Sequence, residues 1–171
     1  KSNIYNFQIN VENANLKKLN FVKDNISKFE GDINVDLSGN TIDNLVGDVF
    51  VKHATYHNTK ATYSIDEFYI NSAFDQNRVR TITVNSGDIV DGVVVGKFYF
   101  NQLQKLVTNS LGSLYENYKP IKVNKGQFLK FDFTIHNKII EIFYPEVSIA
   151  TNTVVKGTIN SDNQEFKLNF N

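Results

Sequence analysis

The chain has 171 residues, in which 18 Lys and Arg residues balance 18 Asp and Glu residues, so its net charge is zero. This length fits one domain with a real hydrophobic core. The balanced charge argues against nucleic-acid binding, which relies on a basic excess. The absence of cysteine excludes disulfides and thiolate chemistry.

The first part of the chain alternates apolar and polar residues, which is the two-residue period of a half-buried strand. Residues 5–11 form the first such segment. We expect the polar residues 13–25 to form a loop or a single helical turn that caps an open edge. Residues 27–38 and 45–57 alternate again on either side of a Gly-Asn turn, which predicts an antiparallel pair with one apolar face.

The middle of the chain continues the pattern with three more predicted strands. Residues 60–70 change their apolar register between Ile65 and Phe68, which predicts a bulge near Asp66 and Glu67. Residues 79–86 and 89–100 are predicted strands, and residues 74–77 before them have the composition of a turn. Val93 and Val95 lie on the side opposite Val94, so we expect the second of these strands to be covered on both faces.

A helix is predicted over residues 102–118, because apolar residues recur there at helical spacing. Asn101 is its expected N-cap and Pro120 its expected end. Gly112 within it lowers intrinsic helix stability by about 1 kcal/mol, so we expect the helix to depend on packing. The residues of its predicted apolar face are Leu103, Leu106, Val107, Leu111 and Leu114.

Strands return after the helix, at residues 129–135, 140–144, 155–159 and 166–170. The predicted fold is therefore a single mainly-β domain over residues 1–171. We expect its long antiparallel strands to curl into a taco-like groove or a flattened barrel, because one helix can cover only part of the apolar face that so many strands present.

No catalytic or metal-binding group stands out. His53 and His57 share a predicted strand, but four residues separate them by about 13 Å, too far for one zinc ion. Asp32, Asp36 and Asp48 fall on polar strand faces, where solvated charges are the simpler interpretation. We therefore expect no enzymatic activity, no cofactor and no metal.

Several segments resemble the late region of TamB-type proteins of the AsmA-like group, which are long envelope proteins of Gram-negative bacteria. They are Gly-Asp-Ile-Asn-Val-Asp-Leu-Ser-Gly-Asn at 31–40, Ile-Asp-Asn-Leu-Val-Gly-Asp-Val at 42–49, Arg-Thr-Ile-Thr-Val-Asn-Ser at 80–86 and Val-Asp-Gly-Val-Val-Val-Gly-Lys-Phe at 90–98. The Asn-, Phe- and Tyr-rich, Cys-free style resembles Bacteroidota-type members. Gly87 departs from the usual Ser-Asp dipeptide of that pattern, which predicts a looser turn there.

The resemblance implies a periplasmic segment of a longer chain whose membrane anchor lies outside this fragment. Its implied role is to shield phospholipid acyl chains during transfer to the outer membrane, and to support outer-membrane protein assembly with a BamA-like barrel partner. Neighbouring segments of the same chain would continue its sheet. The residues that would line the lipid groove are Ile33, Val35, Leu37, Val49, Val51, Val94, Phe98, Phe131, Phe133, Ile135, Ile142 and Leu168.

A second interpretation stays open. From the pattern alone, the same apolar residues fit a closed core, as in a secreted or surface β-sandwich with a structural or adhesive role. An open apolar groove would favour lipid binding, and two tightly packed sheets would favour the sandwich.

Overall fold

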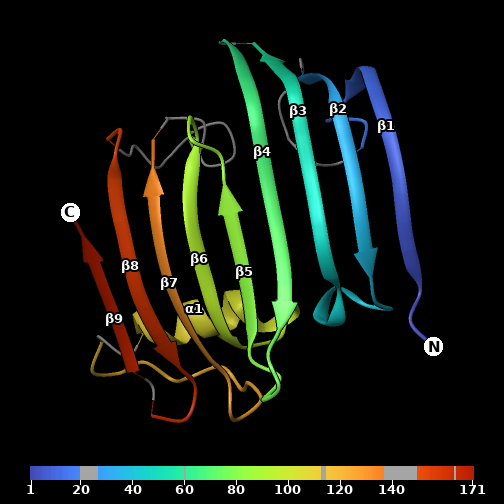
Figure 1. Ribbon diagram of the computed structural model, residues 1–171. Coiled ribbons are helices and arrows are strands. Elements are labelled where there is room, and N and C mark those ends of the chain that lie inside the picture. Colours follow the sequence, from blue (N-terminus) through green and yellow to red (C-terminus); the bar gives the residue numbers. More distant parts are fainter. Residues whose placement is uncertain (20–26, 60, 113–114, 137–149, 164) are drawn as a thin grey trace.

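The computed structural model describes residues 1–19, 27–59, 61–112, 115–136, 150–163 and 165–171, and its strands form one nine-stranded antiparallel sheet. Each strand pairs with the next one in the chain, so the sheet is a simple meander (Figure 1). The predicted fold class, mainly β with long antiparallel strands and one helix, is confirmed. The strands are β1 (Ile4–Asn15), β2 (Ser27–Ser38), β3 (Val46–Asn58), β4 (Thr62–Phe74), β5 (Arg80–Asn85), β6 (Val90–Lys97), β7 (Phe128–Ile135), β8 (Thr153–Asn160) and β9 (Glu165–Phe170).

One face of the sheet is apolar from edge to edge, and we call it the apolar face. Residues paired across neighbouring strands have side chains on the same face. One row of paired residues crosses all nine strands without a polar member, and at about 4.8 Å per strand it spans roughly 38 Å. This central row consists of Phe7, Val35, Val49, Ile70, Val84, Gly92, Phe133, Val155 and Phe170.

Helix α1 (Leu103–Gly112) covers one end of the apolar face. It follows the 3₁₀ helix η2 (Phe100–Gln102) and lies behind the lower parts of β5 to β8 in Figure 1. Leu106 of α1 packs with Leu129 and Ile159 of the sheet, and all three are buried. One packed cluster therefore lies at this end, beneath the helix, and further buried apolar residues, among them Ala54 and Tyr56 of β3, lie elsewhere in the sheet.

Two phenylalanine rings cover glycines on the strands beside them. A methyl group on Gly157 would lie 2.2 Å from Phe131 Cζ, and one on Gly92 would lie 2.2 Å from Phe133 Cδ1. A side chain at either glycine would therefore displace a ring. The glycines give these rings room to lie flat against the sheet.

The bulge predicted at Asp66 and Glu67 is not found at that position. Strands β3 and β4 pair without a register shift. Register shifts lie instead between β1 and β2, at Val11–Ala14, and between β2 and β3, where His53 and Ala54 together stand opposite Gly31 and His53 has a φ of 47°. Gly31 permits this because a methyl group there would lie 2.7 Å from the Ala54 methyl.

The helix is shorter than predicted at its C-terminus. It ends at Gly112, well before Pro120, and Asn101 lies within η2 instead of capping α1. Residues 13–15 continue β1, residues 16–19 form a turn, and the remainder of the predicted loop lies outside the described residues. Ile142, Leu114 and the predicted strand 140–144 also lie outside them. A second 3₁₀ helix, η1 (Ile42–Asn44), was not predicted.

Within the described residues, no helix combines the length and the apolar character that crossing a membrane requires.

Candidate functional site: the apolar face

The predicted groove residues that the structure describes come together on the apolar face. Phe131, Phe133 and Ile135 alternate along β7, and Val94 pairs with Phe131 from β6. Phe98 follows β6 and packs against the buried cluster under α1. The members on the other strands are Ile33, Val35, Leu37, Val49, Val51 and Leu168.

The apolar face is exposed at both edges of the sheet and more buried between them: Phe170 on β9 is 65% exposed, whereas Val35 on β2 is 7% exposed. Ile159 beneath α1 is 2% exposed, whereas Tyr5, Phe7 and Ile9 on β1 are 40%, 42% and 47% exposed. Burying such apolar area releases about 25 cal/mol per Å². The β9 edge and the β1 side of the face are therefore the parts where an apolar ligand would gain most.

A hollow of about 360 Å³ lies on this exposed side, where β1 and β2 meet η1. The described residues that line it carry no charged side chain. Their polar side-chain groups are the amide of Asn40 and the hydroxyl groups of Thr41 and Tyr5. Asn44 fixes this corner, because its Oδ1 accepts from the backbone N–H groups of Asn40 at 2.7 Å and Thr41 at 2.9 Å. The lining residues are Tyr5, Phe7, Val35, Leu37, Asn40, Thr41, Ile42 and Leu45.

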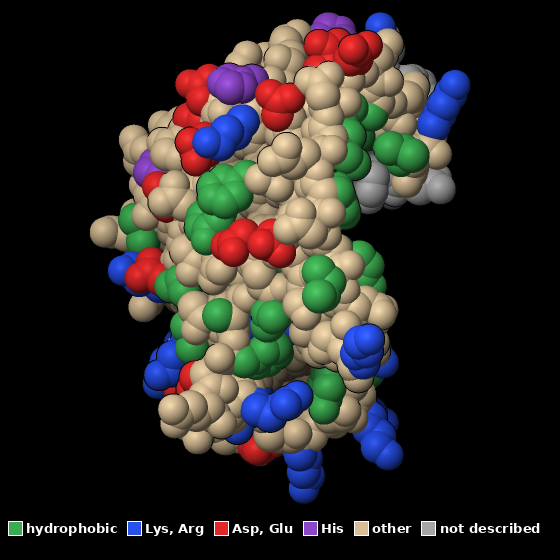
Figure 2. Space-filling model, turned by 45° about the vertical axis from the view of Figure 1, so that its right-hand side comes forward, with side chains coloured by type: hydrophobic (Ala, Val, Ile, Leu, Met, Phe, Trp, Pro, Cys, Tyr) green, Lys and Arg blue, Asp and Glu red, His purple; other side chains and the backbone are tan. Residues whose placement is uncertain are grey.

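The opposite face of the sheet carries the strand charges. Figure 2 shows acidic and basic side chains gathered over the side turned toward the viewer, with hydrophobic side chains between them. Asp32 and Asp36 are exposed there, as predicted. Asp48 differs, because its Oδ1 accepts from the Tyr69 hydroxyl at 2.5 Å and from Asn71 at 2.9 Å. These hydrogen bonds, that from Tyr69 foremost, lower the pKa of Asp48.

Arg80 is a buried cation at the edge of the apolar face, and the sequence analysis missed it. It is 3% exposed and pairs across strands with Gly96 in a row that continues into the buried cluster. Its guanidinium lies 4.5 Å from the Phe74 ring centroid and 5.2 Å from that of Phe100, and it donates to the backbone oxygen of Asp43. Burial lowers the pKa of Arg80. The available signal was a basic residue at an inward-facing position of an alternating strand.

The predicted apolar face of the helix is only partly correct. Leu103 and Leu106 pack against the sheet, but Val107 and Leu111 are 41% and 44% exposed. Ser110, which has the same helical spacing as Leu103 and Leu106, is buried. The exposed pair adds apolar surface beside the groove.

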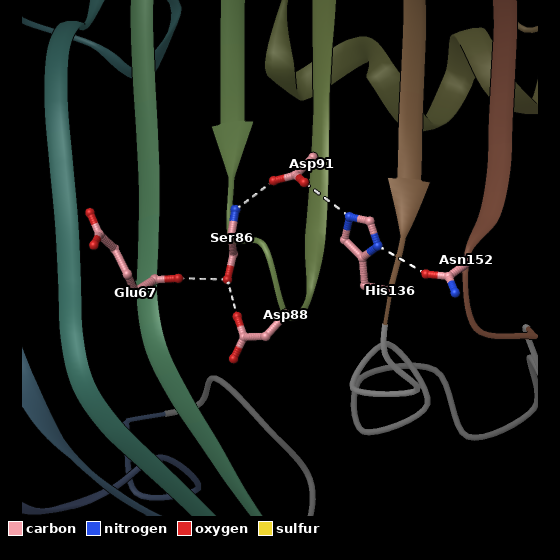
Figure 3. Close-up of polar contacts among 6 residues, drawn as sticks. All are labelled: Glu67, Ser86, Asp88, Asp91, His136 and Asn152. Atoms are coloured by element: carbon pink, nitrogen blue, oxygen red, sulfur yellow. Dashed lines mark hydrogen bonds and ion pairs between the residues drawn. The ribbon is translucent and has the colours of Figure 1, made fainter.

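A polar cluster joins the ends of β5 to β8 at the other end of the sheet (Figure 3). Asp91 Oδ1 accepts from the Ser86 backbone N–H at 2.8 Å, and Asp91 Oδ2 lies 2.9 Å from His136 Nε2. Ser86 is 1% exposed, and its hydroxyl lies 2.6 Å from the Glu67 backbone oxygen and 2.7 Å from Asp88. The imidazole faces Asp91 and not the serine hydroxyl, so the cluster lacks the contact that activates a nucleophile.

Comparison of the chain with family models, with curated proteins and with solved structures finds no match. The family resemblance therefore rests on the residue pattern, and the function that it implies is a proposal.

Proposed function

We propose that this chain is a lipid-shielding segment of a TamB-like envelope protein, whose apolar face holds phospholipid acyl chains. The central row carries the proposal, because it is apolar on every one of nine strands and reaches an exposed edge. A closed domain has no need to leave so long an apolar row half covered.

The mechanism is burial of hydrocarbon against that row. Each CH₂ kept out of water contributes about 0.8 kcal/mol, so burial along several strands offsets the cost of taking an acyl chain out of a bilayer. Phe7 and Leu37 line the hollow beside β1, which offers the first hydrocarbon-sized space on the face.

The outer edges of β1 and β9 extend the proposal beyond this chain. Among the strands that the structure describes, each edge strand has one partner, so its other side offers backbone groups for pairing with a further strand. In this proposal neighbouring segments of the same chain continue the groove, and a BamA-like barrel receives its end. The corresponding location is the periplasm, and the corresponding processes are phospholipid transfer and outer-membrane protein assembly.

The alternative of a β-sandwich module has less support. A sandwich needs two sheets packed face to face, whereas all described strands belong to a single sheet. The helix end supplies a packed core without a second sheet.

Photo-cross-linking tests the proposal with two neighbouring positions on β1. Phe7 points to the apolar face and Asn6 to the polar face, and both are exposed. We expect p-benzoylphenylalanine at Phe7 to form lipid adducts when the protein is irradiated with phosphatidylethanolamine–phosphatidylglycerol vesicles. The same group at Asn6 is expected to form few. Intact-protein mass spectrometry counts the adducts.

Equal labelling at Phe7 and Asn6 would show contact with lipid that does not depend on the face. Absence of adducts at Phe7, in a variant with the circular dichroism of the unmodified protein, would remove the acyl-chain proposal.

A further inference from the structure

An aromatic pair lies on the polar face, where the alternating pattern does not require one. Phe50 of β3 and Tyr69 of β4 pair across the strands with ring centroids 4.4 Å apart. Gln8 and Asn34 complete the same row on β1 and β2. Two amides and two aromatic rings thus stand side by side on the face opposite the proposed lipid groove.

A second hollow, of about 500 Å³, opens beside Phe50. Its lining combines apolar surface, to which Phe50, Ile9 and Ile33 belong, with the polar side chains of the strands, and the side chains of Ile9 and Ile33 belong to the other face. The residues lining it are Gln8, Ile9, Asn10, Asp32, Ile33, Asn34, Phe50 and Lys52.

The hydrogen-bonding groups around this hollow divide into fixed and available ones. Asn10 Nδ2 donates to Asp32 Oδ1 at 2.8 Å, which fixes these two side chains. The exposed Lys52 ammonium lies 3.9 Å from Glu67 and 5.7 Å from the Phe50 ring centroid, so a ligand that stacks on this ring displaces it. The side chains of Gln8 and Asn34 make no hydrogen bond within the described part of the chain. Each amide therefore offers both a donor and an acceptor to a ligand.

We propose that this hollow binds a neutral oligosaccharide, with a sugar ring against Phe50 and its hydroxyl groups on Gln8 and Asn34. A hydroxyl group both donates and accepts, as an amide does. The carbon-bound hydrogens of a sugar ring form an apolar surface that fits an aromatic ring. The lining charges of Asp32 and Lys52 balance, so the hollow favours neither an anionic nor a cationic ligand. The site is independent of the lipid groove on the other face.

Calorimetric titration of the folded chain with cellohexaose, xylohexaose, mannohexaose and maltohexaose tests the proposal. Trigalacturonate serves as an acidic comparison. We expect at least one neutral hexasaccharide to bind, and both Phe50→Leu and Asn34→Ala to weaken its Kd about tenfold by removing a flat ring or a hydrogen-bonding amide. Asn6→Ala is the matched control, because Asn6 is an exposed amide on the same face of β1 outside the hollow.

Failure of all four neutral hexasaccharides to bind at millimolar concentration would overturn the proposal. Binding that favours trigalacturonate, or that Phe50→Leu leaves unchanged in a variant with wild-type circular dichroism, would overturn it as well. Equal losses in Asn34→Ala and Asn6→Ala would place the effect outside the hollow and would also count against it.

Discussion

At the scale of single residues, His136 shows how a surface histidine joins strands. Its Nε2 lies 2.9 Å from Asp91 Oδ2 and its Nδ1 lies 3.1 Å from Asn152 Oδ1, so both ring nitrogens face oxygen acceptors. Only the protonated imidazole has two donors. The hydrogen bond to Asn152, followed by that to Asp91, accordingly raises the pKa of His136.

This predicts a stability that falls as the pH rises. A group whose pKa is raised by folding stabilises the fold fully below its unfolded pKa of about 6.5, and the contribution is lost as the pH passes the folded pKa. In urea unfolding, we expect the free energy of unfolding of wild type to exceed that of His136→Gln by a larger amount at pH 5.5 than at pH 8.5. This stability difference should change by roughly a few tenths of a kcal/mol between the two pH values, because water screens a partly exposed pair.

Asp91→Asn provides the control for this measurement. It removes the negative partner, so it should reduce the same pH dependence in the wild-type background and change it little in His136→Gln. A stability difference between wild type and His136→Gln that stays constant across this pH range would contradict the assignment.

At the scale of elements, the end of α1 is set by a segment that folds back on it. The Tyr118 hydroxyl donates to Asn109 Oδ1 at 2.8 Å, and Asn109 also bonds the Ile121 backbone through both amide atoms. This places the Tyr118 ring against Gly112, where a methyl group would lie 2.4 Å from the ring. The fold-back, and not Pro120, therefore fixes the end of the helix.

Gly112→Ala is accordingly expected to destabilise the protein, although alanine favours helices. Displacing the ring should cost about 1–2 kcal/mol, which exceeds the gain of at most about 1 kcal/mol in helix propensity. In a Tyr118→Ala background the clash is absent, so the same substitution should be neutral or stabilising. Thermal or urea unfolding of the four proteins measures both effects, and the same sign in both backgrounds would refute the fold-back explanation.

At the scale of the whole molecule, Arg80 connects segments that are distant in the sequence. Its guanidinium donates to the Asp43 backbone oxygen in η1, and the Asp43 carboxylate accepts from the Phe100 N–H in η2 at 2.8 Å. The arginine thereby joins η1, β5 and η2 at one end of the sheet. These contacts link η1, which borders the hollow beside β1, to η2, which precedes the helix.

Arg80→Lys should destabilise the fold by about 1–3 kcal/mol, because lysine lacks the flat guanidinium that stacks on aromatic rings and leaves a buried carbonyl with a poorer donor. The nearby Arg78 is exposed, so Arg78→Lys should change stability by less than about 0.5 kcal/mol. Urea unfolding compares the two. Similar small losses in both variants would show that Arg80 has no special role.

The sequence by itself determined the strands and their inward sides. Alternation within β2 and β3 fixes which residues face the same way, because a strand turns each successive side chain to the opposite face. This is why Val35 could be grouped with Ile33 and Leu37, and Phe133 with Phe131 and Ile135, as the inward side of one strand each. It also explains why the bulge was misplaced, since Gly31 and His53 meet only when two strands pair.

Only the tertiary structure decided that the strands form one sheet with a helix packed on one end of it, since local alternation is the same in a groove and in a sandwich. It also brought together Arg80 with Asp43, and His136 with Asp91, 37 and 45 residues apart. Such contacts depend on the register of several consecutive pairings, and no local pattern records that register. For the same reason, the row of Gln8, Asn34 and Phe50 could not be predicted, because these residues come together only when three strands pair.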